Sequence, residues 1–251
     1  MNAPGPREAD PRLVRVGGLS VRVRVQGDGD PLLLLNGVTR PLESWAPLAE
    51  GLRGRTLVSF DAPGVGGSPT PILPLSIRKL ARIAEAVLDE TGLERADVLG
   101  FSHGGAVAQQ LAFQAPSRVT RLILAATTCG VGSVPGSSDA LSRVRASSDT
   151  DPWPRPDFVG TFWHALAIAS WSSIPFLGAI TAPTLVVCGS HDRVVPPANS
   201  RLLARRIPGA ELVMLQAGHD LQRGGQASQL AGAVESFLTG VGARLPLPAG
   251  G

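Results

Sequence analysis

The sequence predicts an α/β fold: a mostly parallel, doubly wound sheet that begins with an antiparallel strand pair. Two segments of alternating polar and apolar residues come first, and short continuous apolar runs then recur between stretches of helical spacing. Alternation is typical of half-exposed strands, whereas continuous runs are typical of strands covered on both faces. The regular exchange of strand and helix favours right-handed crossovers within one sheet.

The opening strand pair is expected at RLVRV (12–16) and SVRVRVQ (20–26), where the period is two residues. Six continuous runs follow, each expected to be a buried strand: PLLLLNG (31–37), TLVSFD (56–61), ADVLGFS (96–102), VTRLILAA (119–126), PTLVVCG (183–189) and AELVMLQ (210–216). Helices are expected in the stretches with helical spacing, at 75–90, 104–114, 197–206 and 226–238.

One segment interrupts this alternation, at about residues 131–177, which are rich in Ser, Pro and Trp and show no strand pattern. Structureless loops of that length are uncommon in compact domains and are usually functional. We therefore expect a cap insertion with short helices of its own. The whole chain, residues 1–251, is then a single domain that carries this cap.

Composition narrows the classes of protein. Hydrophobic residues make up 43% and charged residues 17%, as in a globular domain, and the net charge is +3. The arginines are scattered without interleaved aromatics, which argues against nucleic-acid binding. No apolar run reaches about 18 residues, and MNAPGPREADPR lacks the apolar core of a signal peptide, so we expect no membrane span and a cytoplasmic location. The oligomeric state stays open.

The two cysteines, Cys129 and Cys188, each lie near the end of a predicted buried strand. We interpret them as small buried apolar side chains. A disulfide would require the two strands to be neighbours, and the sequence leaves that open.

The strongest chemical signal is Gly100-Phe101-Ser102-His103-Gly104, placed between a predicted strand and a predicted helix. This strand–turn–helix context is typical of a nucleophile elbow, which exposes the serine Oγ. Glycine on either side lets the strand and the helix approach closely, and the helix N-terminus favours negative charge. A glycine-rich turn with an incidental serine is the alternative. We predict Ser102 as a nucleophile.

A serine hydroxyl needs a base, and the chain has four histidines. His219 follows the last apolar run, as expected where the chain order is serine, acid, histidine. His103, His164 and His191 do not fit that order. A surface histidine is the alternative for His219 if the predicted fold is wrong.

The predicted acid is Asp192, in the turn after the run at 183–189. It would hold the imidazole in one tautomer and stabilise the imidazolium. Three other aspartates are weaker candidates. Asp61 begins a loop and fits a structural turn, Asp97 precedes its strand, and Asp220 adjoins the histidine itself.

An oxyanion hole would need two N–H donors. We predict the backbone N–H groups of His103, which follows the nucleophile, and of Val38, in the loop NGVTR. Asn36 and Gly37 would shape that loop, and Asn36 is also a candidate substrate contact. A plain tight turn is the alternative reading of Asn-Gly. The sequence contains no CxxC, HExxH or phosphate-loop motif, so we expect no metal and no cofactor.

Several segments of the sequence resemble a known family. FDAPGVGGS, GFSHGGAVAQQLAF, TAPTLVVCGSHDRVVP and the AGH near the end resemble the α/β-hydrolase superfamily. The strings DAPGVGGSPTP, LAATTCGVGSVPG and SRLLARRIPGAEL, together with NG after the third strand, are similar to the intracellular medium-chain-length poly(3-hydroxyalkanoate) depolymerases. The similarity extends from about residue 31 to residue 219 and thins in the insertion.

This resemblance implies the α/β-hydrolase fold and hydrolysis of a 3-hydroxyacyl polyester, or of similar esters, at Ser102 with His219 and Asp192. The chain departs from the family in three places. His103 stands where a Trp is expected, and the segment of about residues 136–170 is shorter than expected. LQRGG follows soon after His219, where apolar residues are usual. The cap normally shapes the acyl pocket, so these departures concern polymer specificity.

Aromatic residues of the insertion could form an apolar wall for an acyl chain or, equally, the small core of the insertion. They are Trp153, Phe158, Phe162, Trp163 and Trp171. The expected partner is a small ester or a polyester. Other reactions on the same fold stay open: a cofactor-free haloperoxidase or perhydrolase, a thioesterase, a lactonase or a biosynthetic tailoring enzyme. A non-catalytic ligand-binding protein is a third hypothesis, against which the intact Ser, Asp and His argue.

Overall fold

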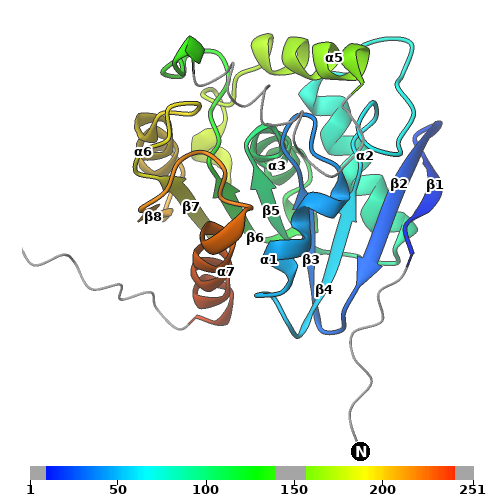
Figure 1. The fold of residues 1–251 in the computed structure, drawn as a ribbon, viewed down its shortest axis with the longest axis horizontal. Coiled ribbons are helices and arrows are strands. Elements are labelled where there is room, and N and C mark those ends of the chain that lie inside the picture. Colours follow the sequence, from blue (N-terminus) through cyan, green and yellow to red (C-terminus); the bar gives the residue numbers. More distant parts are fainter. Residues whose placement is uncertain (1–9, 140–156, 241–251) are drawn as a thin grey trace, which may run out of the picture.

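A computed structural model describes residues 10–139 and 157–240, arranged around one sheet (Figure 1). The sheet has eight strands in the order β1-β2-β4-β3-β5-β6-β7-β8. Among the strands of the described residues, only the β1–β2 and β2–β4 pairs are antiparallel, and the remaining pairs are parallel. The strands are β1 (Arg12–Val16), β2 (Leu19–Gln26), β3 (Asp30–Leu35), β4 (Arg55–Phe60), β5 (Ala96–Phe101), β6 (Val119–Ala125), β7 (Thr184–Gly189) and β8 (Glu211–Leu215). The predicted fold class is confirmed.

Helices cover both faces of the sheet. The α-helices are α1 (Ala46–Ala49), α2 (Ile77–Glu90), α3 (His103–Gln114), α5 (Phe158–Ala169), α6 (Pro197–Arg206) and α7 (Gly224–Thr239). Short 3-10 turns are η1 (Leu42–Trp45), η2 (Pro116–Arg118) and η3 (Leu177–Ala179). Buried residues of α1 and α7 pack on one face, whereas those of α2, α3 and α6 pack on the other. Figure 1 shows α5 at the top of the view, above α3.

Strand β3 shows why the central runs are continuously apolar. Leu33 and Leu35 join the core on the α2–α3 side, whereas Leu32 and Leu34 join the core on the α1–α7 side. All four are almost fully buried. Because successive side chains of a strand point to opposite faces, a strand covered by helices on both sides must be apolar at every position.

The expectation of burial on both faces is wrong for β8. Within the described part of the chain this strand pairs only with β7, so it is an edge of the sheet. Leu212 and Met214 are 36% and 37% exposed, and only Leu215 is buried. The sequence pattern also did not predict η1 and α1, which follow the loop after β3.

The expected insertion contains α5, but residues 140–156 lie outside the described residues, and Trp153 with them. Cys129 and Cys188 are both buried and free, so no disulfide joins them. Across residues 10–139 and 157–240, no helix has the length and apolar character needed to cross a bilayer.

Candidate active site

Ser102 occupies a strained turn between β5 and α3. Its backbone has φ 52° and ψ −117°, a conformation that non-glycine residues rarely adopt. The Ser102 N–H donates to the Ala125 carbonyl at 2.9 Å, and the Ser102 carbonyl accepts from the Thr127 hydroxyl at 2.6 Å. These bonds to β6 and to the residues after it hold the strained backbone in place.

The glycines around Ser102 are required by packing. A Cβ at Gly104 would lie 2.0 Å from the Leu35 carbonyl oxygen, and one at Gly100 would lie 2.5 Å from the Gly104 carbonyl oxygen. At Gly105 it would lie 2.4 Å from Thr127. The glycine spacing of the motif therefore lets α3 begin directly against β3 and β5, with the serine at the turn.

His219 lies in the loop between β8 and α7, and its ring reaches Ser102. The Nε2 atom is 3.2 Å from the Ser102 Oγ, and the Nδ1 atom is 2.8 Å from Asp192 Oδ2. A proton on Nδ1, donated to the carboxylate, leaves the Nε2 lone pair facing the serine hydroxyl. The three residues that the sequence singled out for this chemistry thus meet in one hydrogen-bonded chain.

Asp192 is held in one orientation by the turn that carries it. The side chain is buried, and Oδ1 accepts from the backbone N–H groups of Val194 and Val195, both at 2.8 Å. Only Oδ2 is left for His219. The DRVVP turn after β7 therefore contains Asp192 and also fixes the orientation of its carboxylate.

The loop of residues 36–41 begins where β3 ends and passes beside the elbow. The Asn36 amide donates to the Pro41 carbonyl at 2.9 Å and to the Ser44 hydroxyl at 2.7 Å. Its oxygen accepts from the Gly37 N–H at 3.0 Å, and Thr39 has a positive φ of 67°. Asn36 therefore uses its amide to close the loop that carries Val38.

His103 starts α3, where the first N–H groups of a helix have no partner within that helix. Its side chain is buried against His164 of α5, with ring centroids 4.8 Å apart and planes at 85°. The His164 Nε2 lies 3.0 Å from the Pro63 carbonyl. Burial lowers the pKa of His103 well below 6.5 and also lowers the pKa of His164, so both rings are neutral at pH 7.

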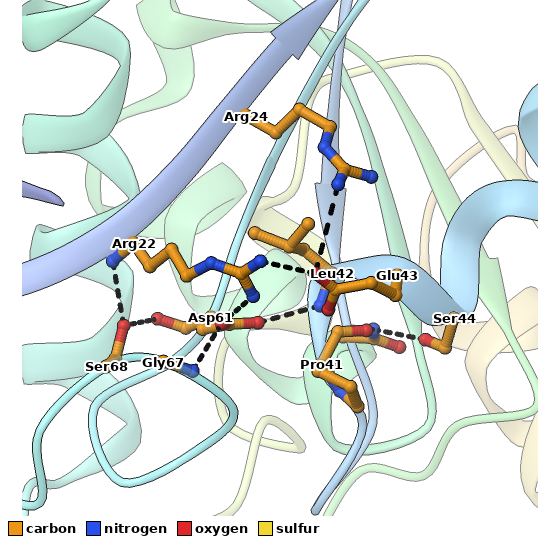
Figure 2. A network of polar contacts seen from close by, with 10 residues as sticks. Arg22, Arg24, Pro41, Leu42, Glu43, Ser44, Asp61, Gly67 and Ser68 are labelled. Carbon is orange, nitrogen blue, oxygen red and sulfur yellow. Dashed lines mark hydrogen bonds and ion pairs between the residues drawn. The ribbon is translucent and has the colours of Figure 1, made fainter. Parts of the chain in front are cut away.

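Asp61 is a structural residue, as predicted, and it anchors the start of η1 (Figure 2). Its carboxylate accepts from the Leu42 N–H at 2.7 Å and from the Gly67 N–H at 2.8 Å, and it pairs with Arg22 at 3.1 Å. The residue is fully buried. It therefore ties β2, the loop after β4 and the end of the 36–41 loop together.

The other candidates lie elsewhere. Asp97 forms ion pairs with Arg121 and Arg55 at the start of β5, the opposite end of the strand from Ser102. The exposed His191 ring has its Nδ1 3.1 Å from the Ser190 hydroxyl.

The aromatic residues of the insertion divide into two groups. Trp163 donates its indole N–H to the Pro71 carbonyl at 3.2 Å, and Trp171 donates to the Gln110 side chain at 2.9 Å, so both pack the insertion onto the domain. Phe158 and Phe162 are instead 73% and 55% exposed. Of the candidate acyl contacts that are described, these two present free apolar surface.

Sequence reasoning missed two residues near this site, Arg40 and Gln222. Arg40 pairs with Asp220, and Gln222 donates to Asn36. One signal pointed here: the polar residues after His219, where the resemblance leads one to expect apolar ones.

Comparisons with known proteins agree with this arrangement. The family model described as "alpha/beta hydrolase fold" matches residues 30–151 and 151–224. A poly(3-hydroxyalkanoate) depolymerase from Ectopseudomonas oleovorans is 35% identical, over 83% of this chain and 85% of that protein. A 2-hydroxymuconate semialdehyde hydrolase from Pseudomonas putida is 29% identical, over 95% and 97%.

Among solved structures, the enol-lactonase from Burkholderia xenovorans LB400 superposes with a TM-score of 0.81 at 26% identity, covering 91% of this chain and all of that one. The strand order, the serine turn after β5 and the matched family model lead to one assignment. The chain belongs to the α/β-hydrolase family.

Proposed function

We propose that the protein is a serine hydrolase of carboxylic esters that works through an acyl-enzyme on Ser102. The observation that carries the proposal is the hydrogen-bonded chain from Ser102 Oγ to His219 Nε2, at 3.2 Å, and from His219 Nδ1 to Asp192, at 2.8 Å. Nucleophile, base and orienting acid in this geometry are the requirements for activating a serine hydroxyl.

In the acylation half, Ser102 Oγ attacks the ester carbonyl carbon while His219 Nε2 takes the hydroxyl proton. Negative charge develops on the carbonyl oxygen, and we assign its stabilisation to the backbone N–H groups of Val38 and His103. Collapse of the tetrahedral intermediate breaks the ester C–O bond. The imidazolium returns its proton to the departing alcohol, and the acyl group stays on Ser102.

In the deacylation half, His219 removes a proton from water, which attacks the acyl-enzyme carbonyl. The second tetrahedral intermediate expels Ser102 Oγ, which recovers a proton from His219, and the carboxylic acid leaves. The Asp192 carboxylate stabilises the positive imidazolium in both halves. Its two backbone donors keep it from rotating away between the steps.

For the substrate, we propose medium-chain 3-hydroxyacyl polyesters or related aliphatic esters. The 35% identical relative named as a poly(3-hydroxyalkanoate) depolymerase supports this class. The exposed Phe158 and Phe162 of α5 are apolar surface suited to an acyl chain. A lactone substrate is the second candidate, supported by the similarity to the enol-lactonase structure.

The test replaces Ser102→Ala and measures turnover of p-nitrophenyl octanoate. We expect a loss of about 10⁴-fold or more, as for removal of a nucleophile. Ser117→Ala, which changes an exposed serine of η2 beyond the far end of α3 from Ser102, is the matched control and should keep full activity. Retained turnover by Ser102→Ala would exclude Ser102 as the nucleophile.

A panel of substrates separates the two candidate classes. It pairs p-nitrophenyl esters of increasing acyl length and an emulsion of medium-chain polyester with five- and six-membered lactones. The proposal expects kcat/KM to rise from acetate to octanoate and soluble 3-hydroxy acids to appear from the polyester. If the lactones are turned over faster than any linear ester, the second candidate, a lactone substrate, is favoured over the polyester.

A further inference from the structure

Two loops far apart in the sequence meet at the candidate active site. The loop of residues 36–41, after β3, carries the proposed oxyanion donor Val38. The loop of residues 216–223, between β8 and α7, carries His219. The proposed reaction needs both loops in one fixed arrangement, because the oxyanion and the imidazolium form together.

The first connection between these loops is a buried hydrogen bond. The Gln222 amide donates to Asn36 Oδ1 at 3.0 Å, across 186 positions of the sequence. Gln222 is fully buried. The same Asn36 oxygen accepts the Gly37 N–H, so the bond reaches the turn immediately before Val38.

The second connection is an ion pair on the other side of Val38. The Arg40 guanidinium donates to Asp220 Oδ2 at 2.8 Å, and Asp220 is the residue directly after His219. Arg223, at the start of α7, pairs with the same oxygen at 2.8 Å. The Arg40 side chain is only 12% exposed, so water screens this pair less than a pair on the open surface.

Both loops also rest on Phe101, the residue before the nucleophile. The Phe101 ring centroid lies 5.3 Å from that of His219 and 5.8 Å from the Arg40 guanidinium carbon. A Cβ at Gly37 would lie 3.2 Å from the same ring. The two loops are therefore joined to each other by the two connections, and both contact Phe101 at the end of β5.

We infer that Arg40, Asp220 and Gln222 are positioning residues that hold the loop of Val38 against the loop of His219. The inference rests on the proposed function, since it assigns these residues to the acylation and deacylation steps. Displacement of a reacting group by about 1 Å can lower a rate by about 10²-fold. The inference thereby gives a role to two polar residues after His219, Asp220 and Gln222.

The test measures kcat and KM for p-nitrophenyl octanoate with Asp220→Asn and Gln222→Met, below the unfolding temperature of each variant. Both substitutions keep the size of the side chain and remove the charge or the donor. We expect kcat to fall about 10- to 100-fold while KM stays within about threefold. Labelling of Ser102 by a fluorophosphonate probe should slow in parallel.

Two comparisons make the assignment specific. Arg40→Lys keeps a positive charge and should retain more of kcat than Arg40→Met. Because Arg40 and Asp220 act through one contact, the double variant Arg40→Met, Asp220→Asn should lose little more than the worse single variant. Losses that multiply in the double variant would overturn a shared role for this pair.

The matched control is Asp89→Asn, which breaks the Asp89–Arg118 ion pair at 2.6 Å between α2 and η2. It should leave kcat unchanged. The inference fails if Asp220→Asn and Gln222→Met both stay within twofold of wild-type kcat, or if Asp89→Asn lowers kcat as much as they do. Failure of the proposed function looks different: the wild-type protein itself would neither turn over esters nor label at Ser102.

Discussion

The nucleophile elbow and the cap helix α5 contact each other, yet they are built in opposite ways. Around Ser102, glycines 100, 104 and 105 leave no room for a single added carbon, and Phe101 and Ala106 are almost fully buried. Helix α5 instead buries a narrow stripe of Gly160, His164 and Ala167. Its other faces carry the exposed Phe158 and Phe162.

The difference teaches where this protein fixes its chemistry and where it leaves room for change. A serine that acts as the proposed nucleophile must stay in place to a fraction of an ångström, and the surroundings of Ser102 are over-determined by packing and backbone hydrogen bonds. A helix that docks through small residues can present varied side chains to a substrate without disturbing the domain beneath. Specificity is then expected to change on α5, and catalysis at the elbow.

The largest effect is expected at Gly104, where a Cβ would lie 2.0 Å from the Leu35 carbonyl oxygen. Gly104→Ala forces α3 away from β3, since two backbone segments must move. We expect a loss of more than about 4 kcal/mol in the free energy of unfolding, or no folded protein. Urea denaturation checks this.

Gly232→Ala on α7 is the control for that prediction, because no atom of the described residues lies within 4 Å of the added carbon. Alanine should raise the free energy of unfolding by about 0.5–1 kcal/mol at such an exposed helical position. A Gly104→Ala protein as stable as the wild type would contradict the packing argument for the elbow.

Next in size is the loss of catalysis from Asp192→Asn. The amide keeps the shape of the side chain, but it cannot stabilise an imidazolium and favours the wrong tautomer of His219. We expect kcat to fall about 10⁴-fold with little change in KM. Asp28→Asn, at an exposed loop position, is the control and should be fully active. A fall of less than tenfold would remove Asp192 from its proposed role.

The sequence was sufficient to predict the elbow side of this comparison. The glycine spacing at 100–105 indicates positions with no space for a side chain, and the continuous apolar runs indicate strands buried on both faces. Both features can therefore be predicted from local sequence patterns. Chain order then placed His219 and Asp192 at the same end of the sheet as Ser102. The structure brings all three together.

The cap side could not be predicted to the same depth. Whether Trp163 packs on Pro71 or faces a substrate depends on how α5 docks, and no local pattern encodes that. The exposure of β8 follows from its position at the sheet edge, which the apolar run LVML (212–215) does not reveal. The Asn36–Gln222 and Arg40–Asp220 contacts join residues far apart in the sequence, so they too required coordinates.

A smaller effect is expected where the two regions touch, at His103 and His164. Burial lowers the pKa of both rings in the folded state, so between the folded pKa and about 6.5 the unfolded chain binds more protons. Stability should therefore fall as the pH drops below about 6.5. Each histidine contributes a slope of up to about 1.4 kcal/mol per pH unit.

Urea denaturation between pH 5 and 7.5 checks this, with His164→Gln expected to flatten the acid slope. The exposed His191→Gln is the control and should leave the slope unchanged. If the free energy of unfolding of His164→Gln depends on pH as steeply as that of the wild type, then His164 does not contribute to the loss of stability in acid.

The smallest effect on stability is expected on the outer face of α5. Phe162 is 55% exposed, so Phe162→Ser should change the free energy of unfolding by less than about 0.5 kcal/mol. If this face contacts the acyl chain, KM for p-nitrophenyl octanoate should rise about two- to fivefold while KM for the acetate stays constant, because only the longer chain reaches it. Leu13→Ser, at a 62% exposed position on β1, is the control, and it should alter neither KM. An equal rise in KM for both esters would mean that Phe162 affects the general shape of the cap and does not select for acyl length. Selectivity would then have to be sought at the elbow.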